Sequence, residues 1–149
     1  MSYNFALAFI PNTAPSMIGA SSSAVASFDE ASSSTKEGPS AAAHGPHTLL
    51  VDPTMLMLDV PPFTPVPGTV IVTLSGASDT YVISVHYDNP RLRVFSEHEL
   101  QEDDGEPLPA EAVFNEIEDP EDAHLEFFCR IAGITPSDLW KLGWAPLAQ

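Results

Sequence analysis

The stretch TVIVTLSGASDTYVISVHY, residues 69–87, determines the fold class of this chain. In residues 69–74, Val70, Val72 and Leu74 alternate with the side chains between them, and residues 81–87 repeat the alternation. Successive side chains of a strand point to opposite faces, so each half predicts a half-buried strand. The small and polar residues 75–79 between them predict a hairpin loop.

The same pattern extends in both directions from this hairpin. Asp88-Asn89-Pro90 favours a turn, and residues 91–95 form a third alternating strand, which completes an antiparallel meander. Apolar runs at 48–51 and 55–60 predict one or two further strands. The expected fold class is α+β: an antiparallel sheet of four or five strands over about residues 47–96, followed by two or three short C-terminal helices.

Residues 61–68 carry four prolines in eight positions. Proline cannot donate to a strand ladder, so the segment predicts a stiff, polyproline-like connector. Pro62 and Pro65 have the P-x-x-P spacing that aromatic-grooved domains bind. The nearest cations, Lys36 and Arg91, lie far away in sequence, so a rigid linker is the favoured interpretation.

Helix signals begin near Ala110 and become clear at Asp119-Pro120, where Asp suits the N-cap and Pro the first helical position. Gly133 can end that helix. A second start follows, with Thr135 as N-cap and Asp138 three residues later. Two apolar faces are predicted, the first from Val113, Phe114 and Ile117 and the second from Leu125, Phe128, Cys129 and Ala132.

Residues 128–142, FCRIAGITPSDLWKL, resemble the helix-turn-helix core of repressor-type DNA-binding domains, because Cys129, Gly133 and Leu139 match its small residue, turn glycine and buried aliphatic. The resemblance implies that Ser137, Asp138 and Lys141 would face bases. Of these three, only Lys141 is a cation, and the acids upstream would repel phosphates. A generic capped helical hairpin is therefore favoured, and direct nucleic-acid binding is not expected.

Residues 1–46 differ in composition from the rest of the chain, with serine and alanine triplets and scattered proline and glycine. Such side chains bury little apolar area, which predicts a low-complexity arm that is disordered unless bound. Its apolar residues Phe5, Phe9 and Ile10 are candidate contacts with a neighbouring subunit. The folded domain is expected at 47–149.

Charge is the outlier of the composition, since 21 Asp and Glu face five Lys and Arg and give a formal net charge of −16. Thirteen of these acids lie between Glu97 and Glu126, where there is no Lys or Arg. Such a surface attracts cationic partners and repels phosphates and anionic membranes. Gly105, Pro107 and Pro109 predict that the first part of this segment is a loop.

No sequence motif in the chain indicates catalysis or a metal site. The G-x-S-x-G, phosphate-loop and dinucleotide patterns are missing. Glu121-x-x-His124, Glu97-His98-Glu99 and His86-x-Asp88 lack the spacing of a closed zinc site, so solvated side chains are favoured and no cofactor or metal is expected. Cys129 lies on an apolar helix face, where cysteine is usually a small hydrophobe.

The compartment is indicated only indirectly. A single cysteine suits a reducing environment, no apolar run has the length of a membrane span, and the first ten residues lack the basic start of a signal peptide. The sequence therefore favours a cytoplasmic protein, or one within an assembled particle.

These observations predict a non-enzymatic interaction or structural protein, a subunit or accessory of a larger assembly (a viral or phage-type accessory protein would suit), with an acidic face for a basic partner. The alternative is a small acidic regulator or inhibitor, of the immunity or DNA-mimic type, that blocks a cationic surface. The candidate partner-binding residues are Glu102, Asp103, Asp104, Glu116, Glu118, Glu121, Asp122, Trp140, Trp144, Phe5, Phe9 and Ile10.

Overall fold

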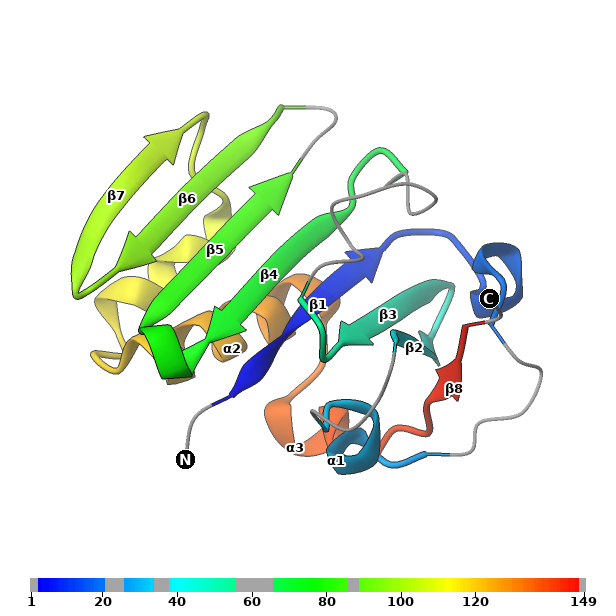
Figure 1. Ribbon diagram of the computed structural model, residues 1–149. Helices are drawn as coiled ribbons and strands as arrows, with labels where there is room; N and C mark the ends of the chain where they lie inside the picture. Colours follow the sequence, from blue (N-terminus) through cyan, green and yellow to red (C-terminus); the bar gives the residue numbers. More distant parts are fainter. Residues whose placement is uncertain (1–2, 21–25, 34–37, 56–65, 86–88, 148–149) are drawn as a thin grey trace.

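A single antiparallel sheet organises the chain, as seen in the computed structural model, which describes residues 3–20, 26–33, 38–55, 66–85 and 89–147. Figure 1 shows the strands side by side in the order β7-β6-β5-β4-β1-β3-β2-β8. The strands are β1 (Asn4–Ile10), β2 (Ser40–His44), β3 (His47–Asp52), β4 (Val70–Ser75), β5 (Thr80–Val85), β6 (Arg91–Ser96), β7 (Glu99–Asp104) and β8 (Ala145–Pro146).

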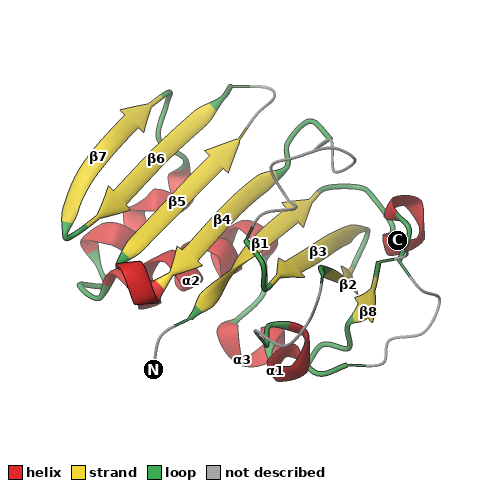
Figure 2. Ribbon diagram, in the orientation of Figure 1, coloured by secondary structure: helices red, strands yellow, loops and turns green. Residues whose placement is uncertain are grey.

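Helices cover one face of this sheet, and both Figure 1 and Figure 2 show α2 and η4 behind the strands. The α+β class and the antiparallel sheet followed by short helices are confirmed, but the sheet has eight strands and not four or five. The helical elements are η1 (Pro15–Ile18), α1 (Phe28–Ala31), η3 (Gly76–Ser78), η4 (Pro109–Asn115), α2 (Pro120–Ala132) and α3 (Pro136–Leu139).

The meander β4-β5-β6 is present as expected, but it continues into β7, where a loop was predicted. The connection is a tight turn in which Glu97 and His98 both have positive φ angles, of 54° and 64°. Two successive left-handed residues are what a two-residue hairpin of matching twist needs. Neither residue is the Asn or Gly that usually signals this turn, and for that reason the sequence did not show the hairpin.

Strand β1 corrects the prediction of a separate arm, because it lies in the middle of the sheet between β3 and β4. Phe5 and Leu7 pack on the helix side, while Ala6, Ala8 and Ile10 pack on the other side. A strand buried on both faces is apolar throughout and lacks the period-2 pattern of a half-buried strand. β2 also lies within residues 1–46 and pairs with β3, so the predicted boundary at residue 46 does not separate arm from domain.

The start and end of α2 are confirmed as predicted. The Asp119 carboxylate accepts a hydrogen bond from the backbone N–H of Asp122, and Gly133 ends the helix with a φ of 72°. Phe127, Phe128 and Cys129 are fully buried against the sheet, where α2 packs on β4, β1 and β5. The apolar face of α2 therefore fixes the helix across the centre of the sheet.

The segment that resembles a helix-turn-helix differs from that motif in its second helix. α3 begins with the predicted cap, in which Thr135 Oγ1 accepts from the backbone N–H of Asp138, but it contains only residues Pro136–Leu139. The chain then turns into β8, which pairs with β2. A helix of one turn offers no length to read a major groove, so the interpretation as a capped hairpin fits better.

Three predicted features fall partly outside the described residues. These are the proline-rich connector at 61–68, most of the apolar run at 55–60 and the end of the strand at 81–87. Among the residues that the structure does describe, no helix is long and apolar enough to cross a membrane.

The central position of β1 gives a direct stability prediction. Leu7→Ala should lower the free energy of unfolding by roughly 2–5 kcal/mol, the usual cost of a cavity in a packed core, because Leu7 is fully buried. Met17→Ala, in the same N-terminal region but 72% exposed, is the control and should change stability by less than about 0.5 kcal/mol. Urea denaturation measures both. Equal, small effects would mean that the N-terminal segment is not part of the core.

Candidate binding surface

The acidic segment does not form one continuous surface, because the fold divides it between strand β7 and the start of α2. All six residues of β7, ELQEDD, are exposed, although the strand is paired along one side with β6. Glu116 and Glu118 precede α2, and Glu121 and Asp122 lie in its first turn. One group of acids therefore lies on a strand and the other at the start of a helix, in different surroundings.

Alternation along β7 sends its acids to two faces. Asp103 pairs in register with Arg93 and its carboxylate reaches Arg91, on the side that the helices cover. Glu102 pairs with Val94 and Asp104 with Leu92, so these two carboxylates lie on the opposite side.

That opposite side is here called the open face, the helix-free side of β5, β6 and β7. Its middle is apolar and half-buried, with Val82 and Val94 side by side in the register. Its edge is acidic, because it ends on β7. Apart from the single turn η3 at the end of β5, Figure 2 shows no helix of the described residues in front of these three strands. The members of the open face are Thr80, Val82, Ser84, Leu92, Val94, Ser96, Glu99, Glu102 and Asp104.

The covered side holds a buried cation, Arg91, which is 3% exposed. Its guanidinium donates to both carboxylate oxygens of Glu111, from Nε at 2.9 Å and from Nη2 at 2.7 Å. It also donates to the Asp103 carboxylate and, over 3.1 Å, to the backbone oxygen of Asp104. The hydrogen bond to Glu111 is the largest cause that raises the pKa of Arg91. One side chain thus joins β6, β7 and η4.

A second arginine, Arg93, lies beside this pair and connects it to α2. Its guanidinium stacks over the Phe114 ring at 4.1 Å, and its Nη1 lies 3.3 Å from His124 Nε2. His124 Nδ1 lies 2.7 Å from the backbone oxygen of Pro120, which can only accept. The proton is therefore on Nδ1, and Nε2 accepts from Arg93. Burial lowers the pKa of His124 to about 4, which keeps the ring neutral.

The described cations all lie away from the open face. Arg130, on α2, donates to both oxygens of Glu116 at 3.1 Å and also reaches Glu126. Lys141 Nζ lies 3.9 Å from the carboxylate of Asp138, just beyond the end of the short helix α3. With Arg91 and Arg93 held on the covered side, the carboxylates of the open face have no cation among the described residues to balance them.

Two of the acids near α2 form hydrogen bonds or ion pairs within the chain. Glu121 accepts a hydrogen bond from the backbone N–H of Tyr3 at 2.9 Å, which ties the start of β1 to α2. Glu116 is paired with Arg130, and this hydrogen bond lowers the pKa of its carboxylate. Glu118 and Asp122 are exposed.

Several predicted partner contacts are buried in the chain's own core, which corrects them. Phe5 is 3% exposed, Ile10 is 7% exposed and Trp144 is fully buried, so none offers a surface to another molecule. Phe9 is half-buried against His47, with 4.9 Å between ring centroids. Trp140 is half-buried against Phe28, at 4.6 Å. Phe9 and Trp140 therefore keep part of their side chains outside the core, whereas Phe5, Ile10 and Trp144 do not.

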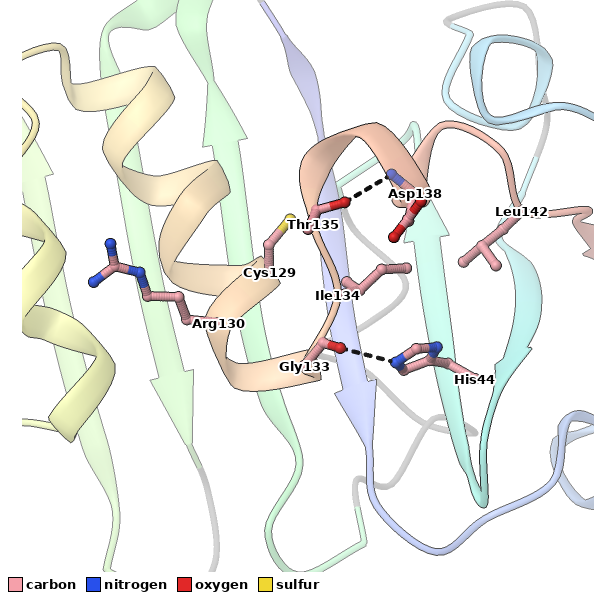
Figure 3. Close-up of a pocket in the computed structure, with 8 residues that line it drawn as sticks. All are labelled: His44, Cys129, Arg130, Gly133, Ile134, Thr135, Asp138 and Leu142. Carbon is pink, nitrogen blue, oxygen red and sulfur yellow. Dashed lines mark hydrogen bonds between the residues drawn. The ribbon is translucent and has the colours of Figure 1, made fainter.

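A shallow pocket of about 490 Å³ lies between β2 and the α2–α3 turn, as Figure 3 shows. His44 reaches across it, with Nε2 3.3 Å from the backbone oxygen of Gly133. Burial raises the pKa of the Cys129 thiol to about 12, so this cysteine is not a thiolate nucleophile. Its lining residues are His44, Cys129, Arg130, Gly133, Ile134, Thr135, Asp138 and Leu142.

The histidine and carboxylate pairs noted in the sequence do not converge on a metal site within the described part of the chain. His124 uses both ring nitrogens internally, and His98 Nε2 lies 3.4 Å from the Asp79 carboxylate at the hairpin ends. The pair formed by residues 86 and 88 lies outside the described residues.

Comparisons with protein-family models, with curated proteins and with solved structures find no match to this chain.

The buried histidine predicts a pH dependence of stability. An unfolded histidine has a pKa of about 6.5, so between pH 6.5 and 4 the unfolded chain binds a proton that folded His124 does not. The contribution is complete above pH 6.5 and is lost as the pH falls toward 4. Its size is about 2 kcal/mol between pH 7 and 5, at roughly 1.36 kcal/mol per pH unit.

Urea titrations at pH 7, 6 and 5 measure this dependence. His124→Gln should be less stable than the wild type at pH 7 but should lose about 2 kcal/mol less between pH 7 and 5. His98→Asn, which removes an exposed histidine and suits the left-handed backbone there, is the matched control. If the wild type and His124→Gln had the same pH dependence, a neutral, buried His124 would be ruled out.

Proposed function

We propose that this chain is a non-enzymatic interaction protein, a subunit or accessory of a larger assembly, that binds a basic protein through its open face. One observation carries the proposal: the described cations are all paired on other surfaces, while Glu99, Glu102 and Asp104 edge an apolar, helix-free sheet face. An apolar centre with a charged rim is the usual composition of a protein interface.

The charge of the chain supports a cationic partner. A formal charge of −16 creates a negative potential that accelerates encounter with a basic protein and discourages association with nucleic acids or anionic membranes. Because Arg91 and Arg93 lie on the covered side, no described cation offsets the carboxylates where the open face meets β7.

Three described groups that could act as catalysts are engaged within the structure, and this supports a non-enzymatic role. The Cys129 thiol is buried with a raised pKa, and His124 is held neutral between Pro120 and Arg93. The carboxylate of Glu111 is bound by Arg91.

The alternative function is a small acidic regulator or inhibitor that covers a cationic surface. Exposed Glu118 and Asp122 favour it, because they form a second acidic group at the start of α2, apart from β7. The two functions would use different acids, so paired variants separate them.

The experiment compares two double variants with equal net charge. Wild-type protein, Glu102→Gln/Asp104→Asn and Glu118→Gln/Asp122→Asn are immobilised, exposed to a lysate of the source cells and eluted at rising salt, and bound proteins are identified by mass spectrometry. A candidate partner is then purified and its affinity is measured by calorimetry. The proposal expects a basic partner whose affinity falls at least tenfold with the first pair and less than threefold with the second.

A loss of affinity confined to Glu118→Gln/Asp122→Asn would mean that the acids at the start of α2 bind the partner. It would favour the function as an inhibitor. A partner whose binding is insensitive to both pairs and to salt would contradict the proposal. Both pairs are exposed, and the Asp104 contact with Arg91 is made by its backbone oxygen, so neither variant should unfold the chain.

A further inference from the structure

We propose that β7 accepts a basic extended segment of the partner as an additional strand of the sheet. This inference rests on the proposed function, that the acidic surface binds a basic protein, and it adds the mode of binding. Strand addition to an exposed sheet edge supplies main-chain hydrogen bonds for affinity and side-chain contacts for specificity.

The two edges of the sheet differ in what they offer. β8, at one end, has only two residues, and its Pro146 lacks a backbone N–H. β7, at the other end, has six residues, all exposed, and among the described strands it pairs with β6 alone. In an edge strand, the backbone N–H and C=O groups of every second residue point away from the sheet and have no strand partner. Between the two edges, β7 is the one long enough to take a further strand.

The side chains of β7 select the chemistry of the added strand. The Cβ atoms of directly opposite residues on neighbouring strands lie about 4.5–5.5 Å apart. A strand beside β7 would therefore place its alternate residues against Glu102 and Asp104 on the open face. Lysine or arginine at those positions would form opposite-charge pairs. On the other face, Leu100 is 46% exposed and offers an apolar contact within the acidic strand. A segment that alternates basic and β-branched residues fits this edge.

A second copy of the chain does not fit it. Pairing of β7 with another β7 would bring four acids of each strand, Glu99, Glu102, Asp103 and Asp104, against four of the other. Like charges directly opposite each other destabilise a ladder, and each chain also carries a net charge of −16. The acids therefore protect this edge from self-association while leaving it open to a cationic strand.

The edge is already held in strand geometry before any partner binds. Arg91 bonds the carboxylate of Asp103 and the backbone oxygen of Asp104, which fixes the last residues of β7. Gly105 then turns away with a φ of 89°, and a side chain there would collide with the backbone oxygen of Pro90, 2.1 Å from the Cβ position. A strand fixed in advance loses less entropy on binding.

The register of β7 locates the paired segment. A bulge leaves Gln101 as an extra residue opposite the step from Val94 to Phe95. Residues 102–104 after the bulge keep a regular register with β6, and Arg91 bonds two of them, Asp103 and Asp104. The added strand is therefore expected to pair beside residues 102–104.

Two synthetic peptides of ten residues test this mode of binding on the full chain. Alternating lysine and threonine gives a peptide that can form a strand, whereas alternating lysine and proline gives the same charge but cannot form a ladder. We expect the lysine–threonine peptide to bind at least tenfold more tightly by calorimetry. It should shift the amide resonances of residues 99–106 and slow hydrogen exchange of the outward-facing amides of β7.

Each result supports or overturns the inference. Equal affinity for the two peptides would mean purely electrostatic attraction and would overturn strand addition while leaving the proposed function intact. Shifts confined to the first turn of α2, or no binding at millimolar peptide, would also overturn it. So would concentration-dependent dimerisation through β7 in sedimentation experiments. Glu102→Gln/Asp104→Asn should weaken the lysine–threonine peptide at least tenfold, and Glu118→Gln/Asp122→Asn less than threefold.

Discussion

The bidentate pair between Arg91 and Glu111 is the interaction on which the acidic end of the molecule depends. β7 is composed of residues with poor strand preference and has no buried side chain of its own. It remains a strand because Arg91, buried in β6, bonds Asp103, Asp104 and Glu111 at once. A buried arginine without these partners would be costly, so η4, β6 and β7 are stable only together.

The pair between Arg91 and Glu111 also places positive charge on the covered face of the sheet and leaves the open face negative. Five basic residues face 21 acids, and the two central arginines are used beneath the helices, beside Phe114 and His124. The open face consequently presents carboxylates next to half-buried valine and leucine. The arrangement that stabilises the covered side thus produces the surface that we propose for binding, and it directs the choice of partner toward basic proteins.

Local features of the sequence predicted the meander and the helix ends, because each depends on neighbouring residues, such as Asp119 with Pro120 and Thr135 with Asp138. The place of β1 could not be predicted in this way, since a strand buried on both faces carries no alternation and its partners lie 38 to 71 positions away. β7 could not be predicted because its acidic residues are not typical of a strand and because the Glu97-His98 turn before it contains no glycine. The acids were named as candidates from their residue type alone, and which of them are engaged within the chain depends on contacts distant in sequence, such as Arg91 with Glu111 and Tyr3 with Glu121.

Amide hydrogen exchange followed by NMR tests most directly whether β7 is a strand held by Arg91. In the wild type, the amides of residues 99–104 that face β6 should be protected, although every side chain of the strand is exposed. Glu111→Gln removes one charge of a buried pair, at a cost of roughly 3–5 kcal/mol, and should lower protection in β7 and η4 by at least about a hundredfold. Glu118→Gln should leave it unchanged. Exchange of the wild-type β7 amides at the rate of an unfolded peptide would contradict the account.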